Sequence, residues 1–229
     1  MAESFDPQTK AEFDQYAGSY DELHKQNVAI SGEGPEYFAV YKQRFLERLL
    51  GRQRTPLLDF GCGIGNLTRL LVGPFADVAG YDPSLDSVAL ARQRAPEATF
   101  YADLDAIPQG HFGAVVVANV LHHVPPADRA PLLAKVARVL APGGKLVVFE
   151  HNPHNPVTRK VVRDCAFDEN AVLLPPSETR GLLEGAGLGP ASLDYIVFFP
   201  RPLAALRGLE PSLSWLPLGA QYAAWASKR

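Results

Sequence analysis

Three acidic residues stand at the ends of short apolar runs in the first half of the chain. Asp59 lies within "PLLDF", Asp82 follows "VAGY" and Asp103 follows "TFYA". Each carboxylate can accept hydrogen bonds: Asp59 from an ammonium group, Asp82 from a ribose diol and Asp103 from the exocyclic amine of a purine. The alternative interpretation of Asp82 is that it caps the helix that begins at Ser84. For the contact with the purine amine, Asp105 is an alternative candidate to Asp103.

The glycines of "LLDFGCGIGNLTRLL" form the turn that follows the first of these acids. They stand at positions 61, 63 and 65, so Asn66 occupies the place where a dinucleotide fingerprint has its third glycine. No Gly-Lys-Ser or Gly-Lys-Thr is present, which excludes a P-loop. Asp59, just ahead of Gly61, is unfavourable beside a pyrophosphate and suits a ligand with a cationic amine. A ligand with an amine, a ribose and a purine is S-adenosylmethionine.

Histidines supply the candidates for acid–base chemistry. His151 follows a strongly apolar run and is our candidate catalytic base for an acceptor hydroxyl. In "LHHV", one of His122 and His123 is expected to be structural, and we take His123 as the substrate contact. His151 and His154 have a spacing that suggests a metal site, but the prolines of "EHNPHNP" prevent a regular helical face, so we expect no metal.

Two further residues after that run are candidate substrate contacts. We assign Asn152 and Arg159 to the acceptor, with Arg159 as a clamp for an acidic group. A solvated surface position is the competing interpretation for Arg159. Cys62 is interpreted as a small turn residue, because no activating base can be placed beside it.

Strands and helices must alternate to position these side chains. Because parallel strands end at the same edge of a sheet, the acids and His151 are expected to meet there. Expected strands span 56–60, 77–82, 98–103, 113–119 and 145–151, and expected helices span 34–50, 66–73, 84–95 and 125–140. The alternation predicts an α/β, Rossmann-like doubly wound sheet with right-handed crossovers.

The pattern changes after His151, and the chain divides accordingly. We expect an N-terminal helical lid over 1–55 and a core over 56–229 with a cap insert at 151–176. A helix is expected from a Ser177 cap to a Gly187 stop. Strands over 192–200 and 220–228 would add an antiparallel end to the sheet.

Composition sets the class of protein and of partner. The 229 residues include 47% hydrophobic and 21% charged residues with a net charge of −3, which is typical of one globular domain and argues against nucleic-acid binding. Two cysteines far apart and no apolar secretion core favour a cytoplasmic protein, and no apolar run is long enough for a membrane span. The sequence leaves open whether two copies of the chain form a homodimer.

Five stretches resemble class I S-adenosylmethionine-dependent methyltransferases that act on small molecules. They are "LLDFGCGIG", "GYDPS", "YADL", "GAVVVANVLHHV" and "LAPGGKLVVFEH", in order over about residues 55–151. The resemblance implies a seven-stranded sheet with an antiparallel last strand, and S-adenosylhomocysteine as the product. It implies cofactor contacts by Asp59 and Gly61 along the methionine, by Asn119 and Val120 near its end, by Asp82 at the ribose and by Asp103 with Leu104 at the adenine. It also implies cofactor contacts by Gly63 and Pro83, and a cover formed by Tyr16 and Tyr20.

The expected reaction is methyl transfer to a small-molecule acceptor, at a hydroxyl or acid oxygen in preference to nitrogen. Two alternatives remain at this point. One is a nicotinamide-dependent oxidoreductase, which Asn66 argues against. The other is an S-adenosylmethionine-binding protein that does not transfer methyl groups.

Overall fold

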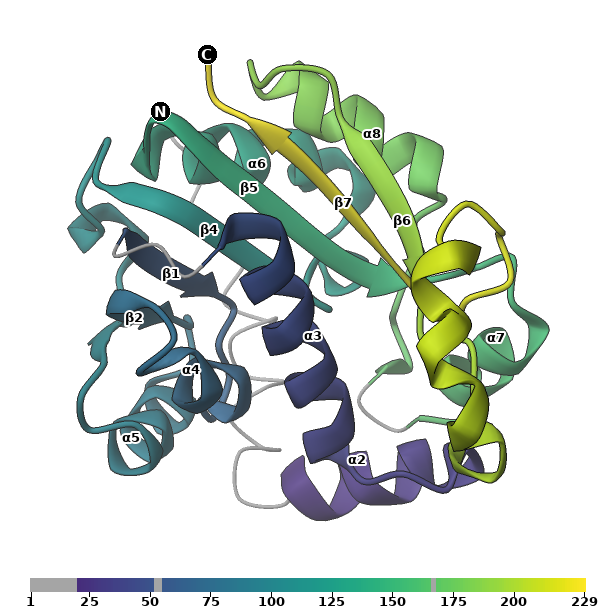
Figure 1. Cartoon of the computed structure of the whole chain (residues 1–229). Coiled ribbons are helices and arrows are strands. Elements are labelled where there is room, and N and C mark those ends of the chain that lie inside the picture. The colour runs from purple at the N-terminus through teal and green to yellow at the C-terminus, as the bar shows by residue number, and fades with distance from the viewer. Residues whose placement is uncertain (1–19, 52–54, 166–167) are drawn as a thin grey trace.

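The computed structural model describes residues 20–51, 55–165 and 168–229, and a seven-stranded sheet forms its centre (Figure 1). The strands are β1 (Pro56–Phe60), β2 (Ala76–Tyr81), β3 (Thr99–Tyr101), β4 (Phe112–Ala118), β5 (Leu140–His151), β6 (Ser192–Ile196) and β7 (Gln221–Ser227). Their order is β3-β2-β1-β4-β5-β7-β6; β7 pairs antiparallel with both β5 and β6, and the other neighbouring strands are parallel. The predicted Rossmann-like doubly wound sheet with an antiparallel last strand is confirmed.

Helices connect the strands and cover both faces of the sheet. They are α2 (Tyr20–Val28), α3 (Pro35–Leu50), α4 (Asn66–Leu71), α5 (Leu85–Arg94), α6 (Pro126–Val139), α7 (Pro156–Arg163) and α8 (Pro176–Gly185). The 3-10 helices are η1 (Ala29–Ser31), η2 (Leu104–Ala106), η3 (Leu121–His123) and η5 (Arg201–Leu213). Among the residues described, no helix combines the length and apolar character needed to cross a bilayer.

Helix ends follow the sequence signals in one case and depart from them in another. Ser84 caps α5 as predicted, since its hydroxyl oxygen accepts the Ser87 N–H at 3.1 Å. The predicted cap at Ser177 is wrong, because α8 already begins at Pro176. Proline is favoured at the first helical position, where its fixed φ suits the helix and its missing N–H costs nothing.

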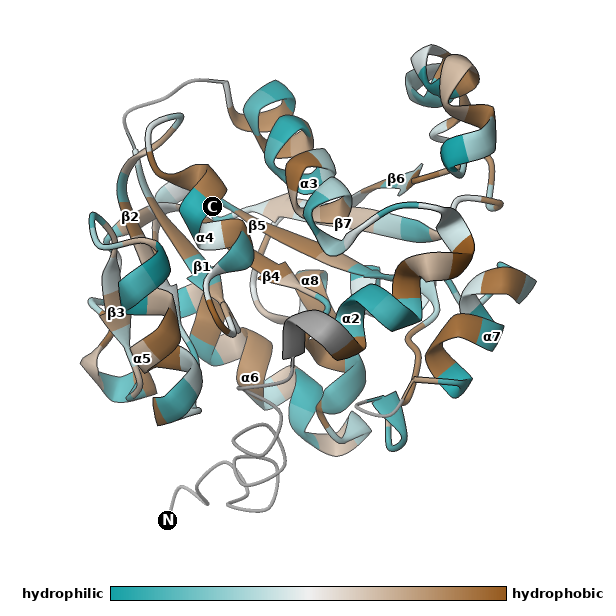
Figure 2. Cartoon of the chain, turned by 90° about the horizontal axis from the view of Figure 1, so that it is seen from below, coloured by the Kyte–Doolittle hydropathy of each residue, from teal (hydrophilic) through white to brown (hydrophobic). Residues whose placement is uncertain are grey.

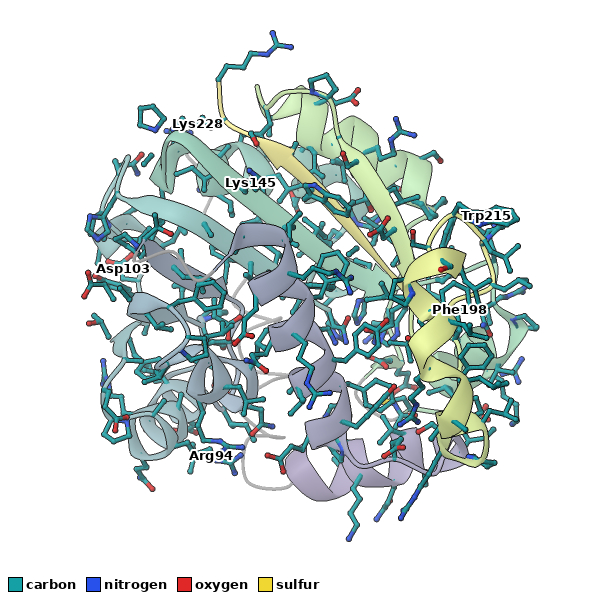
Figure 3. All side chains as sticks on the ribbon, viewed as in Figure 1. Arg94, Asp103, Lys145, Phe198, Trp215 and Lys228 are labelled. Atoms are coloured by element: carbon teal, nitrogen blue, oxygen red, sulfur yellow. The ribbon has the colours of Figure 1, made fainter. Side chains whose placement is uncertain are left out.

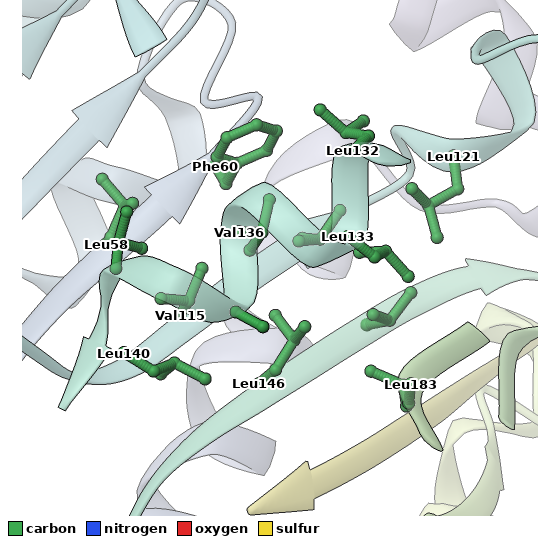
Figure 4. Close-up of a cluster of buried hydrophobic side chains, with 14 of the residues drawn as sticks. Leu58, Phe60, Val115, Leu121, Leu132, Leu133, Val136, Leu140, Leu146 and Leu183 are labelled. Atoms are coloured by element: carbon green, nitrogen blue, oxygen red, sulfur yellow. The ribbon is translucent and has the colours of Figure 1, made fainter. Parts of the chain in front are cut away.

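Successive residues of each central strand pack against opposite helical layers. Leu58, Val115 and Leu146 belong to the cluster beneath α6 and α8 (Figure 4). Their neighbours Leu57 and Val116 face the other layer, which includes α3 and α4. This two-residue alternation explains why these strands are continuously apolar in sequence, and why β1, β4 and β5 are coloured as hydrophobic in Figure 2.

A roof formed by α2, η1 and the N-terminal part of α3 lies at the carboxyl ends of the strands, with α7 beside α2 (Figures 1 and 2). The segment at η5 braces this roof. The Tyr41 hydroxyl donates to Oε2 of Glu210 at 2.6 Å, and Arg207 donates to Glu33 at 2.8 Å. The buried Glu210 also accepts the N–H groups of Phe198 and Phe199 through Oε1. The C-terminal segment at η5 therefore holds the N-terminal roof in place.

Candidate active site

A cavity of about 590 Å³ opens where β1, β2, β4 and β5 end beneath the roof. Its wall includes residues at the end of each strand or just past it, such as Gly61, Asp82, Asn119 and His151. A crevice at the carboxyl ends of parallel strands is where open α/β sheets bind ligands. The prediction that the acids and His151 meet at one edge is correct for Asp59, Asp82 and His151.

The glycine turn after β1 is held rigidly by the end of β2. The N–H groups of Gly61 and Cys62 donate to the carbonyl of Tyr81 at 2.7 and 2.9 Å. Gly61 has φ +77°, and a Cβ built there would lie 2.4 Å from Cγ2 of Val120. Gly63 has φ +51°, and a Cβ there would meet no atom within 4 Å, so its backbone is open to a ligand.

Asp82 joins the turn to the next helix. Its Oδ2 accepts the Gly63 N–H at 2.8 Å and its Oδ1 accepts the Ser84 N–H at 2.9 Å. The carboxylate lines the cavity and is 9% exposed. Since each carboxylate oxygen has two lone pairs, acceptor capacity remains for a ligand. Ser84, and not Asp82, is the cap of α5.

Two amide side chains in the cavity wall carry buried oxygens in need of a donor. Oδ1 of Asn119 and Oε1 of Gln221 receive no hydrogen bond from any described residue. Asn119 also has φ +57°, a conformation that turns the chain just past β4. A buried polar atom without a partner is costly, so a ligand with hydrogen-bond donors fits this wall. S-adenosylmethionine, with its ammonium and hydroxyl groups, meets that requirement.

A buried acid of β1 and a buried lysine of α3 both face the cavity. Asp59 accepts the Thr68 hydroxyl at 2.7 Å, and burial raises its pKa to about 6. Lys42 of α3 is 6% exposed, with its ammonium 5.9 Å from the Phe149 ring centre. Burial lowers the Lys42 pKa to about 8, against the opposing influence of Glu150 and Asp59. This part of the wall thus holds an acidic and a basic group that influence each other.

Glu150 organises the loop that follows β4. It is fully buried, and its Oε1 accepts the N–H groups of Val120 and Leu121 at 3.1 and 2.7 Å. Its Oε2 lies 2.6 Å from Nδ1 of His122. Although burial opposes its charge, His122 outweighs burial and lowers the pKa of Glu150. An ionised carboxylate only accepts, so Nδ1 of His122 is the donor.

Asp168 completes a cluster with the two adjacent histidines. Its Oδ1 lies 3.5 Å from Nε2 of His122 and 3.4 Å from Nε2 of His123. Burial disfavours the His122 cation, but Glu150 and Asp168 outweigh it and raise the His122 pKa to about 9. Burial, followed by the charge of His122, lowers the His123 pKa to about 3. The prediction that one of this histidine pair is structural fits His122, which is 2% exposed.

His151 ends β5 and lines the cavity beside this cluster. Its ring centre lies 5.0 Å from that of His122. Burial, followed by the His122 charge, lowers the His151 pKa to about 4. The position agrees with the predicted opening of His151 onto the same cleft as Asn119.

Two predicted substrate contacts do not line the cavity. Asn152 is fully buried and donates to the carbonyls of Pro217 and Gly219 at 3.2 and 2.8 Å, so it anchors the loop before β7. Arg159 is exposed on α7, whose cavity face carries Val157 and Val161. A residue two positions from Val157 points to the other side of a helix, so Arg159 faces away.

The predicted adenine contacts also stand outside the cavity wall. Asp103 lies at the outer edge of the molecule, far from Phe198, which lines the cavity (Figure 3). Its Oδ1 accepts the Asp105 N–H at 3.0 Å and caps η2. Leu104 packs on the core cluster beneath α6. The predicted cover by Tyr16, and by the side chain of Tyr20, lies outside what the structure describes.

Sequence reasoning missed Lys42, Glu150 and Asp168. Lys42 sits in a helix with other charged residues, and charge there usually signals a solvated face. Glu150 offered a signal, because an acid inside the apolar run "KLVVFEH" must be buried with a partner. Asp168 lies far along the chain from both histidines, so no spacing reveals the cluster.

The family comparison agrees with this geometry. A family model described as a methyltransferase domain matches residues 58–148. A trans-aconitate 2-methyltransferase from Mycobacterium ulcerans is 33% identical over 187 residues, which cover 75% of this chain and 68% of that protein. The chain belongs to the class I S-adenosylmethionine-dependent methyltransferases.

This methyltransferase also resembles a protein of less defined role. An uncharacterized methyltransferase from Halobacillus halophilus is 31% identical over 143 residues, or 60% of this chain. The match spans 64% of the length of that relative.

Solved methyltransferase structures share the fold. An S-adenosylmethionine-dependent methyltransferase from Thermotoga maritima superposes with a TM-score of 0.71 at 16% identity, over 96% of this chain and 100% of that one. Magnesium protoporphyrin IX methyltransferase from Synechocystis PCC 6803 with bound S-adenosylmethionine has a TM-score of 0.62 at 17% identity, with full coverage of both chains. Membership of the family gives S-adenosylmethionine as the cofactor of this methyltransferase.

Proposed function

We propose that this protein transfers the methyl group of S-adenosylmethionine to an oxygen of a small acidic or hydroxylated molecule. The observation that carries the proposal is the shared cavity, which is lined both by the Gly63–Asp82 turn and by the imidazoles of His123 and His151. One enclosed space can then bring two reactants together and exclude water.

Lys42 and Asp59 are proposed to hold the amino-acid end of the cofactor. An α-carboxylate would accept hydrogen bonds from the Lys42 ammonium, and an α-ammonium would donate to Asp59. Both side chains are buried in the cavity wall, where such bonds are least screened by solvent. Asp82 is proposed for the ribose diol, while Asp103 and Leu104 remain proposals for the adenine.

The chemistry divides between the cofactor and the protein. S-adenosylmethionine, when bound, supplies an electrophilic methyl group on a sulfonium that is already a good leaving group. His151 is proposed to take the proton of a hydroxyl acceptor at a ring nitrogen. His123 is proposed to contact the acceptor, since it lines the same cavity.

An acid acceptor is supported by two relatives. Trans-aconitate 2-methyltransferases from Mycobacterium ulcerans and Mycobacterium marinum are 33% and 30% identical over 187 residues. An acid that is already ionised needs no base, whereas a hydroxyl does. The dependence of turnover on His151 therefore distinguishes a hydroxyl acceptor from an ionised acid acceptor.

The test is the release of S-adenosylhomocysteine with panels of polycarboxylic acids, hydroxy acids, phenols and amines, followed by mass spectrometry of the methylated product. We expect an oxygen methyl product. For a hydroxyl acceptor, His151→Ala should lower turnover roughly 100-fold with unchanged cofactor affinity. His111→Ala is the control, because His111 is exposed outside the cavity.

Two results would overturn the proposal. Tight S-adenosylmethionine binding with no product from any panel would indicate a binding protein without transferase activity. Calorimetric binding of a nicotinamide cofactor in preference to S-adenosylmethionine would indicate an oxidoreductase.

A further inference from the structure

His122, His123 and Asp168 bring three metal-ligating groups to one point of the cavity wall. One ligand atom from each residue lies within 4.8 Å of the others. Oδ1 of Asp168 is 3.5 and 3.4 Å from the two Nε2 atoms, which is longer than a good N–H···O hydrogen bond. Bonds of about 2.1 Å to one ion place neighbouring ligand atoms roughly 3.0–3.4 Å apart. The two separations from Asp168 are therefore close to those of ligand atoms that share one cation.

Glu150 presents His122 in the orientation that a metal ligand needs. Its Oε2 lies 2.6 Å from Nδ1 of His122, so this carboxylate fixes the ring and leaves Nε2 directed towards Asp168. Metal-ligating histidines almost always donate their second ring nitrogen to a carboxylate, a carbonyl or water in this way. The orientation is independent of the distances to Asp168 and supports the same site.

Charge balance points to a divalent ion. Glu150 is 0% and Asp168 4% exposed, so two carboxylates are buried around one pair of imidazoles. Buried charges are stable only when they are paired or coordinate a metal. The imidazolium form of His122 lies between Glu150 and Asp168 and supplies one positive charge to these two carboxylates. A divalent cation on Nε2 of His122, in place of the ring proton, supplies two. Two imidazole nitrogens with one carboxylate favour a first-row transition metal over Mg²⁺ or Ca²⁺.

The three ligands leave room for a further one. All of them line the cavity, and the His123 side chain is 16% exposed while that of Asp168 is 2% exposed. Three protein ligands with an open position are typical of metal sites that take a substrate. His151, beside His122, also lines this part of the wall.

We propose that His122, His123 and Asp168 bind one divalent transition-metal ion, and that its open position takes an acidic oxygen of the methyl acceptor. The second half of this proposal rests on the proposed methyltransferase function. The sequence expectation of no metal considered His151 and His154. His154 is exposed and does not line the cavity.

Calorimetric titration of the full chain without a histidine tag, first freed of metal by chelation, tests the site with Zn²⁺. We expect one Zn²⁺ per chain and no comparable binding of Mg²⁺. Asp168→Asn and His123→Gln should each weaken Zn²⁺ binding by more than roughly 100-fold, beyond the 10–100-fold typical of a lost partner outside the ligand set. His154→Gln is the matched control and should bind Zn²⁺ normally.

Co²⁺ provides a measurement on the unmutated chain, which is unaffected by any folding defect of a variant. Visible ligand-field bands that disappear on adding excess Zn²⁺ would support nitrogen and oxygen ligation at this one site. Failure of the wild-type chain to bind either ion, or equal Zn²⁺ affinity in the Asp168→Asn variant, would overturn the site.

Titration of the same metal-free samples with S-adenosylmethionine separates the two proposals. Cofactor binding without Zn²⁺ binding would refute the metal site and leave the proposed function intact. Zn²⁺ binding without cofactor binding would refute the function and leave the metal site.

Discussion

Oδ2 of Asp82, at the end of β2, accepts the backbone N–H of Gly63, in the turn after β1, at 2.8 Å. The acid proposed for the ribose and the backbone proposed for close approach are therefore one rigid unit. The Tyr81 carbonyl adds two further hydrogen bonds from Gly61 and Cys62. A rigid platform lets the cofactor bind without ordering the loop, which would cost affinity.

Gly63→Ala should weaken S-adenosylmethionine binding at least about 10-fold, because the new methyl group occupies cavity space against which the ligand packs. No atom lies within 4 Å of a Cβ at this position, so the substitution adds little internal clash. Gly110→Ala is the matched control: φ is +63° there, the space is open and the cavity is remote. Calorimetry measures the affinity of both variants for S-adenosylmethionine. Equal affinities of the Gly63→Ala and Gly110→Ala variants would contradict the role of Gly63. Gly61 is a poorer probe, because its added side chain would strike Val120.

Asp82→Asn should lower cofactor affinity about 10–150-fold, which corresponds to roughly 1.5–3 kcal/mol for a lost hydrogen bond to a charged group. The amide nitrogen cannot accept, so one of the bonds from Gly63 and Ser84 is also lost. Asp86→Asn, at an exposed acid in the same segment, should leave affinity unchanged. Calorimetry with S-adenosylmethionine would show the difference, and wild-type affinity in Asp82→Asn would remove Asp82 from the site.

Cofactor affinity should fall as pH rises through about 8, because the Lys42 pKa is lowered to about 8 by burial. The ammonium that would hold the cofactor carboxylate is present below that pH and lost above it. The charged groups that face Lys42 are Asp59 from β1 and Glu150 and His151 from β5.

Lys42→Arg separates this ionisation from that of the cofactor itself. A guanidinium stays charged to pH 12 and above, so the decline near pH 8 should be reduced in that variant. Lys42→Met should lose about 10–150-fold in affinity at pH 7. Identical pH profiles for wild type and Lys42→Arg would show that Lys42 does not bind the ligand.

Arg129→Leu should destabilise the fold by about 3–5 kcal/mol, since several buried groups lose their donor at once. The Arg129 guanidinium donates to the carbonyls of Leu121, Val124 and Val172 and to Glu178. Urea unfolding measures the loss. Arg138→Leu, on the exposed face of the same helix α6, should change stability by less than about 0.5 kcal/mol. A loss below about 1 kcal/mol for Arg129→Leu would contradict this account.

The core of the fold is readable from the sequence because its signals are local. The runs at β1, β4 and β5 are apolar on both faces, and Ser84 marks the start of α5 in the expected place. Asp59 and Asp82 reach the cavity for the same reason, since they belong to strand ends. A cytoplasmic location, homodimer formation and the division into lid, core and cap remain predictions.

The part of the site beyond the strand ends depends on long-range contacts, which no local pattern encodes. Asp168 meets His122 and His123 only because the segment after α7 folds back, with the Val172 N–H donating to the His122 carbonyl. Asn152 is predicted as a substrate contact, yet its amide nitrogen donates to two backbone carbonyls. The direction of Arg159 depends on the rotation of α7, which sequence spacing alone did not fix.

The bracing of the roof has a consequence for how the protein folds. The bond between Tyr41 and Glu210 joins residues 169 positions apart, and that between Glu33 and Arg207 joins residues 174 positions apart. Forming contacts between residues so far apart in the sequence requires closing a long loop, which has a large entropic cost. These contacts stabilise the fold only once that loop is closed. The strands β1 to β5 can pair with one another before η5 and β7 are in place, but the roof closes only when nearly the whole chain is present. A nascent chain that still lacks η5 therefore has the glycine turn but not the enclosed cavity.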